Sequence, residues 1–92
     1  MSNQLWVRGE EIQHVASVLG NGTCLRILNL LSKRSLDVST LASKLGLTES
    51  TVSVDVQELQ NLGLLDVTYG KGKRGIRKIC RLAKNSIHIK LR

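Results

Sequence analysis

The chain has 92 residues, 41% of them hydrophobic, which suits one small core, so we expect a single domain over residues 1–92. It has no apolar run near the roughly 18 residues of a membrane span and no secretory signal, which predicts a cytoplasmic protein away from membranes. Nine basic residues and no acid occupy residues 71–92, so the net charge of +7 lies at one end and indicates a polyanionic partner.

Two helices are predicted in the first third of the chain. Apolar residues at the spacing of one helical face begin at Ile12 and end at Leu19, just before the glycine-rich residues 20–22. Thr23 is a suitable N-cap for a second helix. The broad apolar face of this helix, over residues 24–31, predicts a position in the centre of the core.

A helix-turn-helix is predicted in the middle of the chain. Ser39 is a candidate cap for a short third helix, which Gly46 ends through its access to the left-handed conformation. Thr48 is a candidate cap for a fourth helix over about residues 49–62, and Gly63 is its C-terminal stop. Two helices joined by a short turn around a glycine are typical of helix-turn-helix units.

The pattern changes to that of β-strands after the fourth helix. Apolar and polar residues alternate over residues 64–69, and a second β-favouring segment follows a glycine-rich turn, which predicts a hairpin over about residues 64–82. A further short strand is predicted over residues 87–91. This order predicts a mainly helical α+β fold. It resembles a winged helix-turn-helix, with three to four helices and a β-hairpin wing.

Four short motifs follow one another through the helix-turn-helix segment. They are Ser39, Leu41 and Ala42; Leu45, Gly46 and Leu47; Ser50, Thr51, Val52 and Ser53; and Leu62, Gly63 and Leu64. In this order they resemble the ArsR-type transcriptional regulators, and Arg26, Ile27 and Leu28 stand at matching places in the second helix. The resemblance covers about residues 12–82.

The resemblance implies a cytosolic, usually dimeric regulator that sets the second helix of its motif into the major groove of DNA. Family members often carry a basic residue or His after the position of Ser53 and a Lys later, whereas this chain has Val54, Asp55 and Gln57. They also often carry a metal-binding Cys pair in the segment that corresponds to residues 35–42, which contains no Cys here. We therefore predict no metal site and no cofactor.

Two sets of residues are predicted to contact DNA. Hydroxyl, amide and apolar groups on the outer face of the fourth helix suit base edges and thymine methyls. This set comprises Thr48, Glu49, Ser50, Thr51, Ser53, Val54 and Gln57. Cations of the wing suit phosphates and the minor groove, and they comprise Lys71, Lys73, Arg74, Arg77 and Lys78. Weaker contacts are predicted from the helix ends at Ser39 and Lys44.

Each set also has a simpler interpretation. Any solvated surface helix shows polar outward residues, and the acids of the fourth helix, Glu49, Asp55 and Glu58, would be repelled by phosphates. The basic wing is also compatible with a loop that only raises solubility, although so many cations without an acid are unusual for that purpose. Attraction to DNA therefore has to come from the wing.

No catalytic site is predicted, so we do not expect an enzyme. Cys24 and Cys80 interrupt apolar patterns and are expected to be buried thiols rather than a redox pair or metal ligands. His14 and His88 are expected at the surface. The glycine-rich residues 70–75 lack the ending and the helix of a phosphate-binding loop. With no Phe, one Trp and one Tyr, the chain lacks aromatic platforms for single-stranded nucleic acids.

A dimer interface is predicted from apolar segments near the two ends of the sequence. These segments contain Leu5, Trp6 and Val7 at one end and Ile87, Ile89 and Leu91 at the other. The two segments are predicted to pair as strands, either within one chain or between two. In the alternative interpretation, Trp6 only covers the core of its own chain.

The leading functional prediction is a transcriptional regulator that binds specific double-stranded DNA as a dimeric repressor, associated with the nucleoid if the source is prokaryotic. Its half-sites would lie roughly 34 Å apart, one turn of the duplex. Two alternatives stay open. The winged helix could bind another protein through its acidic fourth helix, or it could coat DNA without sequence preference.

Overall fold

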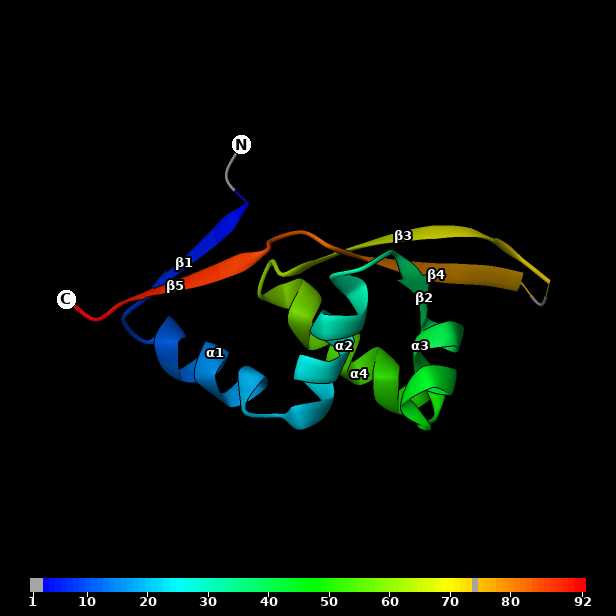
Figure 1. Cartoon of the computed structure of the whole chain (residues 1–92), viewed down its shortest axis with the longest axis horizontal. Helices are drawn as coiled ribbons and strands as arrows, with labels where there is room; N and C mark the ends of the chain where they lie inside the picture. Colours follow the sequence, from blue (N-terminus) through cyan, green and yellow to red (C-terminus); the bar gives the residue numbers. More distant parts are fainter. Residues whose placement is uncertain (1–2, 74) are drawn as a thin grey trace.

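The computed structural model describes residues 3–73 and 75–92, which form four helices and five strands. In chain order these are β1 (Gln4–Arg8), α1 (Glu11–Leu19), α2 (Gly22–Leu31), β2 (Leu36–Asp37), α3 (Val38–Leu45), α4 (Glu49–Asn61), β3 (Leu65–Gly72), β4 (Gly75–Leu82) and β5 (Ser86–Lys90). The helices lie on one side and most of the strands on the other (Figure 1). The predicted winged helix-turn-helix is confirmed.

The core lies where α2, α3 and α4 meet the base of the hairpin formed by β3 and β4. Its fully buried side chains include Ile27 of α2, Leu41 of α3, Val56 of α4 and Cys80 of β4. On α4, Val52, Val56 and Leu59 all point inward, as their helical spacing predicts. Burial of this apolar surface fixes α4 against the core and leaves its opposite face toward solvent.

Side-chain caps begin α2, α3 and α4, and left-handed glycines follow the ends of α3 and α4. Gly46 and Gly63 have φ angles of 70° and 83°, the conformation expected of residues that end helices. The caps predicted for α2 and α3 are wrong. The Asn21 side chain accepts a hydrogen bond from the backbone N–H of Thr23, so Asn21 caps α2. Asp37 accepts from Thr40 and caps α3, which places Ser39 inside the first turn.

The wing belongs to a three-stranded antiparallel sheet in the order β2, β4, β3. Strands β3 and β4 pair from Leu65 opposite Leu82 to Gly72 opposite Gly75, which matches the predicted hairpin. Strand β2 was not predicted, because two residues carry no alternation pattern and extend only by pairing with β4. The tip of the hairpin projects beyond the helices (Figure 1).

Strands β1 and β5 form a separate, parallel two-stranded ribbon, so the predicted strand pairing occurs within one chain. Val7 is buried beneath the ribbon, whereas Trp6 alternates to the outer face and is 61% exposed. The alternative in which Trp6 covers the core is therefore wrong. Trp6 stacks on His88, which is half-buried rather than fully at the surface. His14 is exposed, as predicted.

Candidate nucleic-acid interface

The first turn of α4 presents a cluster of hydroxyl groups to solvent. Thr48 caps the helix as predicted, since its Oγ1 accepts from the backbone N–H of Thr51 at 3.2 Å. The same Oγ1 donates to Thr51 Oγ1 at 2.9 Å and lies 3.2 Å from Ser50 Oγ. All three residues are exposed. Hydroxyls that both donate and accept are suited to base edges or phosphate oxygens at this helix N-terminus.

Farther along α4, the outer face combines apolar and amide groups. Val54 is 62% exposed, which is high for a branched apolar side chain on a packed helix. Gln57 is exposed as well, and its Nε2 donates to Asn61 Oδ1 at 3.0 Å. This bond uses one of the two N–H groups of the Gln57 amide, so Oε1 and the second N–H remain for a paired contact with a base. Lys44, at the end of α3, is exposed.

An open groove of about 980 Å³ lies between the wing and the first turns of α3 and α4. Predicted contacts from the helices and from the wing line this groove, whereas Thr48, Ser50, Thr51, Val54 and Gln57 of the predicted set lie outside it. The lining contacts are Ser39, Glu49 and Ser53 from the helices, and Lys71, Lys73, Arg77 and Lys78 from the wing. Arg74, also predicted as a contact, lies outside the described residues. The basic wing and the start of α4 therefore share one concave surface.

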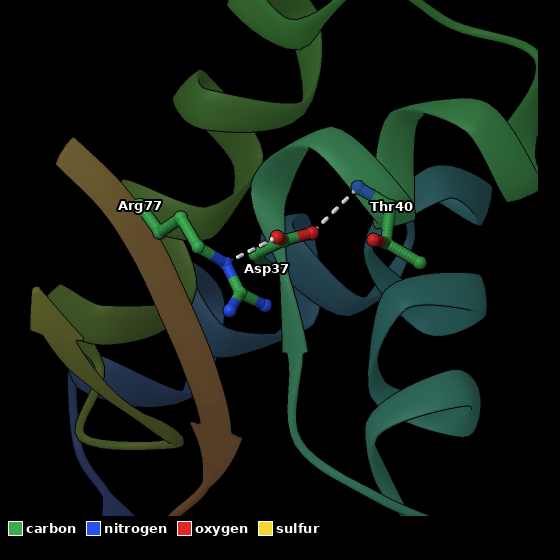
Figure 2. Close-up of polar contacts among 3 residues, drawn as sticks. All are labelled: Asp37, Thr40 and Arg77. Carbon is green, nitrogen blue, oxygen red and sulfur yellow. Dashed lines mark hydrogen bonds and ion pairs between the residues drawn. The ribbon is translucent and has the colours of Figure 1, made fainter. Parts of the chain in front are cut away.

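The wing is joined to α3 by a contact that the sequence reasoning missed. Asp37 Oδ2 accepts from Arg77 Nε at 2.9 Å, while Oδ1 accepts from the backbone N–H of Thr40 at 2.8 Å (Figure 2). Hydrogen bonds from Thr40, and then the Arg77 guanidinium, hold the pKa of Asp37 below its usual range. The preference of Asp for helix N-caps was a usable signal for Thr40, but nothing local pointed to Arg77.

Asp55 does not lie on the exposed face where its charge would repel phosphates. It is 9% exposed, and its Oδ1 accepts from Asn21 Nδ2 at 3.4 Å. Burial, followed by the nearby Glu58, raises the pKa of this carboxyl. The sequence contained the signal, because residue 55 continues the inward spacing of Val52, Val56 and Leu59. Because the side chain is charged, Asp55 was counted instead among the acids of the helix that phosphates would repel.

The two thiols are buried, as predicted, and lie in different elements of the core. Burial and the neighbouring Asp55 raise the pKa of Cys24 to about 11. Within the described parts of the chain, no three His, Cys, Asp or Glu side chains gather closely enough to bind a metal ion. No helix within residues 3–73 and 75–92 has the length and apolar character needed to cross a membrane.

Comparison with protein families decides where the chain belongs. The family described as "Bacterial regulatory protein, arsR family" matches residues 21–67, about half of the chain. The matched segment runs from the cap of α2 into β3 and contains the whole helix-turn-helix. This chain belongs to the ArsR family. The predicted resemblance is confirmed, and the fold of this ArsR-family protein is that of transcriptional regulators. No curated protein matches it in sequence.

Solved structures similar to this ArsR-family protein include two of one fragment from Mycobacterium bovis. The solution structure of a homodimeric winged helix-turn-helix DNA-binding domain, a possible ArsR-family regulator, is 30% identical with a TM-score of 0.68. The match covers 80% of this chain and 65% of that one, just under two thirds. The crystal structure, titled a possible transcriptional regulatory protein, is also 30% identical, with a TM-score of 0.67 over 80% of this chain and 75% of that one.

A transcriptional regulator homologue from Pyrococcus horikoshii is also similar to this ArsR-family protein. It is 25% identical with a TM-score of 0.64, and the match covers 80% of this chain and 76% of that chain. The shared fold is thus found at low sequence identity, as expected when core spacing and helix ends define it.

Proposed function

We propose that this protein is a transcriptional regulator that binds specific double-stranded DNA as a homodimer. The observation that supports this most directly is the groove in which the exposed start of α4 faces the cations of the wing. A helix alone would face the phosphates with Glu49 and Glu58 and without a basic residue. The wing supplies the attraction that the helix lacks, so both elements are needed to bind one duplex.

In this proposal, α4 enters the major groove and reads bases. Its hydroxyl groups contact several bases or the adjoining phosphates, Val54 contacts a thymine methyl, and Gln57 pairs with an adenine through Oε1 and the N–H that Asn61 does not use. Glu49 accepts from the amino group of a cytosine, because a carboxylate has no attraction to a phosphate. Ser39 and Lys44 lie at the two ends of α3 and contribute weaker backbone contacts.

The wing binds the sugar-phosphate backbone beside the helix. Lys71, Lys73 and Lys78 are assigned to phosphates, and each releases condensed counterions when it binds. Arg77 approaches the same stretch of DNA backbone while its guanidinium stays paired with the Asp37 carboxylate. Arg74 is included on its charge and its place in the sequence.

The homodimer is proposed to form through the ribbon of β1 and β5. The ribbon exposes apolar side chains on both of its faces: Trp6 is 61% exposed on the outer face, and Ile89, opposite Val7 on the other face, is 47% exposed, while Leu91 just after β5 is 85% exposed. The Mycobacterium bovis relative is itself described as homodimeric. In Figure 1 the ribbon and the wing tip lie toward opposite ends of the long axis, so a two-fold axis at the ribbon leaves both wings outermost.

Bound to a promoter, such a dimer would compete with polymerase for the duplex, which makes repression the proposed outcome. The proposed unit is the single domain predicted over residues 1–92. It acts in the cytoplasm, at the nucleoid of a prokaryotic cell, and the proposal contains no catalytic step.

Selection of duplexes from a random pool at two salt concentrations tests this function. We expect one palindromic site to be enriched and bound more tightly than a scrambled duplex. Lys71→Ala and Lys73→Ala should weaken binding to both duplexes and reduce the slope of log affinity against log salt by about 0.9 each. Arg26→Ala removes the same charge from the exposed surface of α2 and is the control.

Three outcomes would contradict the proposal. Equal affinity for selected and scrambled duplexes would indicate an architectural protein that coats DNA. No binding to either duplex, combined with capture of a basic protein that Glu49→Lys and Glu58→Lys abolish, would indicate a protein-interaction module. If Arg26→Ala weakened DNA binding and reduced the salt slope as much as the wing variants do, the wing would have no special role in the interface.

A further inference from the structure

One carboxylate joins the wing to the helix-turn-helix. Asp37 is the last residue of β2 and pairs with Ile79 of β4, and it directly precedes α3. Each of its two oxygens serves a different element, since Oδ1 accepts from Thr40 in α3 and Oδ2 from Arg77 in β4 (Figure 2). With only 13% of its side chain exposed, Asp37 is better shielded than Arg77, at 51%.

The outer wing needs such a connection to keep one orientation. Strand β2 pairs only with Ile79 and Cys80, so the pairing of β3 with β4 continues alone from Lys78 to the tip. Tyr69 and Ile76 in this outer part are 68% and 79% exposed, which shows little packing against the helices. A two-stranded hairpin twists and bends readily when nothing covers its faces. Arg77 lies in this outer part, beyond the residues that β2 holds.

We propose that Asp37 is a positioning residue that holds the wing at a fixed angle to α3 and α4, so that both elements meet one duplex in register. The part of this inference that concerns DNA rests on the proposed function. The carboxylate offsets the charge of Arg77 and so subtracts from the attraction to phosphate. Its contribution to recognition is therefore geometric, and it should affect the choice between duplexes more than the total affinity.

A second ion pair in the same hairpin provides a matched control. Arg81 Nη2 donates to Asp66 Oδ2 at 2.7 Å, and these residues stand opposite each other on β4 and β3. This pair connects the hairpin to itself rather than to a helix. Replacing either Asp37 or Asp66 removes one negative charge that faces an arginine of β4. The two variants therefore change the net charge equally, and only the first of them disconnects the wing from α3.

The first experiment compares Asp37→Ser with Asp66→Ser on a selected and a scrambled duplex. Serine at position 37 keeps an N-cap for α3 but is too short to reach Arg77. Both variants should bind the scrambled duplex somewhat more tightly. Asp37→Ser should lower the affinity ratio of selected to scrambled duplex on the order of fivefold, whereas Asp66→Ser should leave this ratio unchanged. The same ratio in both variants would overturn the positioning role.

The second experiment needs no DNA. Residual dipolar couplings of backbone amides should fit one common orientation of the hairpin and helices in the wild type and in Asp66→Ser. In Asp37→Ser the couplings of β3 and β4 should no longer fit the orientation of α3 and α4. Unchanged couplings would overturn the proposal. Arg77→Gln removes the same ion pair without touching the cap, and it decides the question if Asp37→Ser does not fold.

The two experiments separate this inference from the proposed function. If the wild type binds selected and scrambled duplexes equally, the specific regulator is rejected while the dipolar couplings still decide the role of Asp37. If the wild type discriminates and the couplings stay the same in Asp37→Ser and Arg77→Gln, the regulator stands and the positioning role is rejected.

Discussion

Trp6 and His88 stack across the ribbon with ring centroids 4.5 Å apart and planes inclined by 19°. They are direct neighbours in the register of β1 and β5 and belong to the outer face of the ribbon. An indole held by a neighbouring ring loses little further side-chain entropy when a partner covers it. Such a rigid, exposed aromatic group is suited to the centre of a protein interface.

If the ribbon forms the dimer, Trp6→Ala should raise the dimer dissociation constant at least about tenfold, because buried Trp side chains dominate interface energies. Sedimentation equilibrium measures this directly. At protein concentrations low enough for the wild type to be monomeric, the unfolding midpoint should change little, since most of the side chain is exposed. Ile76→Ala removes another exposed apolar side chain, from the wing, and should leave dimerisation unaltered. An unchanged dissociation constant in Trp6→Ala would place the interface elsewhere.

Val54 should make the protein sensitive to a thymine methyl. Replacing the contacted thymidine of the selected duplex with deoxyuridine removes that methyl and should weaken wild-type binding about fourfold, the effect of about 0.8 kcal/mol for one buried carbon. Val54→Ala should bind both duplexes more weakly and lose most of the difference. Ser53→Ala, the control at the neighbouring position, should still bind the thymidine duplex more tightly than the deoxyuridine duplex. Fluorescence anisotropy titrations give all the affinities, and equal sensitivity in Val54→Ala would contradict the contact.

Asp55→Asn should stabilise the protein at neutral pH. The folded state raises the pKa of Asp55, so the ionised form disfavours folding at pH 7. The amide keeps an oxygen for Asn21 without the buried charge, and we expect a gain on the order of 1 kcal/mol in the free energy of unfolding. Urea denaturation followed by circular dichroism measures it.

The same carboxyl predicts how this gain depends on pH. Because its pKa is higher in the folded state, protonation of Asp55 stabilises the wild type as the pH falls from neutral through the folded pKa toward the unfolded value. The advantage of Asp55→Asn should therefore shrink as the pH is lowered toward 4. A difference that stays constant with pH, or a loss of stability at pH 7, would contradict the raised pKa.

The parts of the fold that local chemistry determines were predictable from the sequence. Thr48 caps α4, and Gly46 and Gly63 end helices, because each position requires a particular side chain or backbone conformation. The inward face of α4 followed from apolar spacing, and the hairpin followed from alternation around its glycine-rich turn. On α1 the buried residues are Val15 and Val18, so the face predicted there was only partly right. These features depend on residues a few positions apart.

What the sequence left undetermined depends on distant residues. Strand β2 exists because β4 pairs with it, and the contact of Asp37 with Arg77 joins positions 40 residues apart. Thr23 was predicted to cap α2, but the helix is capped two residues earlier, by Asn21, a position that the backbone conformation rather than residue preference decides. Of the predicted DNA contacts, those on the groove walls come from four elements, α3, α4, β3 and β4, and from the turn between the two strands. Their grouping required the tertiary structure.

The parallel ribbon has a mechanical consequence. Strand β1 follows the amino terminus, β5 precedes the carboxyl terminus, and the two run in the same direction. Tension applied between the ends of the chain therefore shears this pair along its length, and its backbone hydrogen bonds share the load instead of breaking in succession. Since the paired residues are about eighty positions apart in sequence, their contact closes a very long loop and should form late in folding.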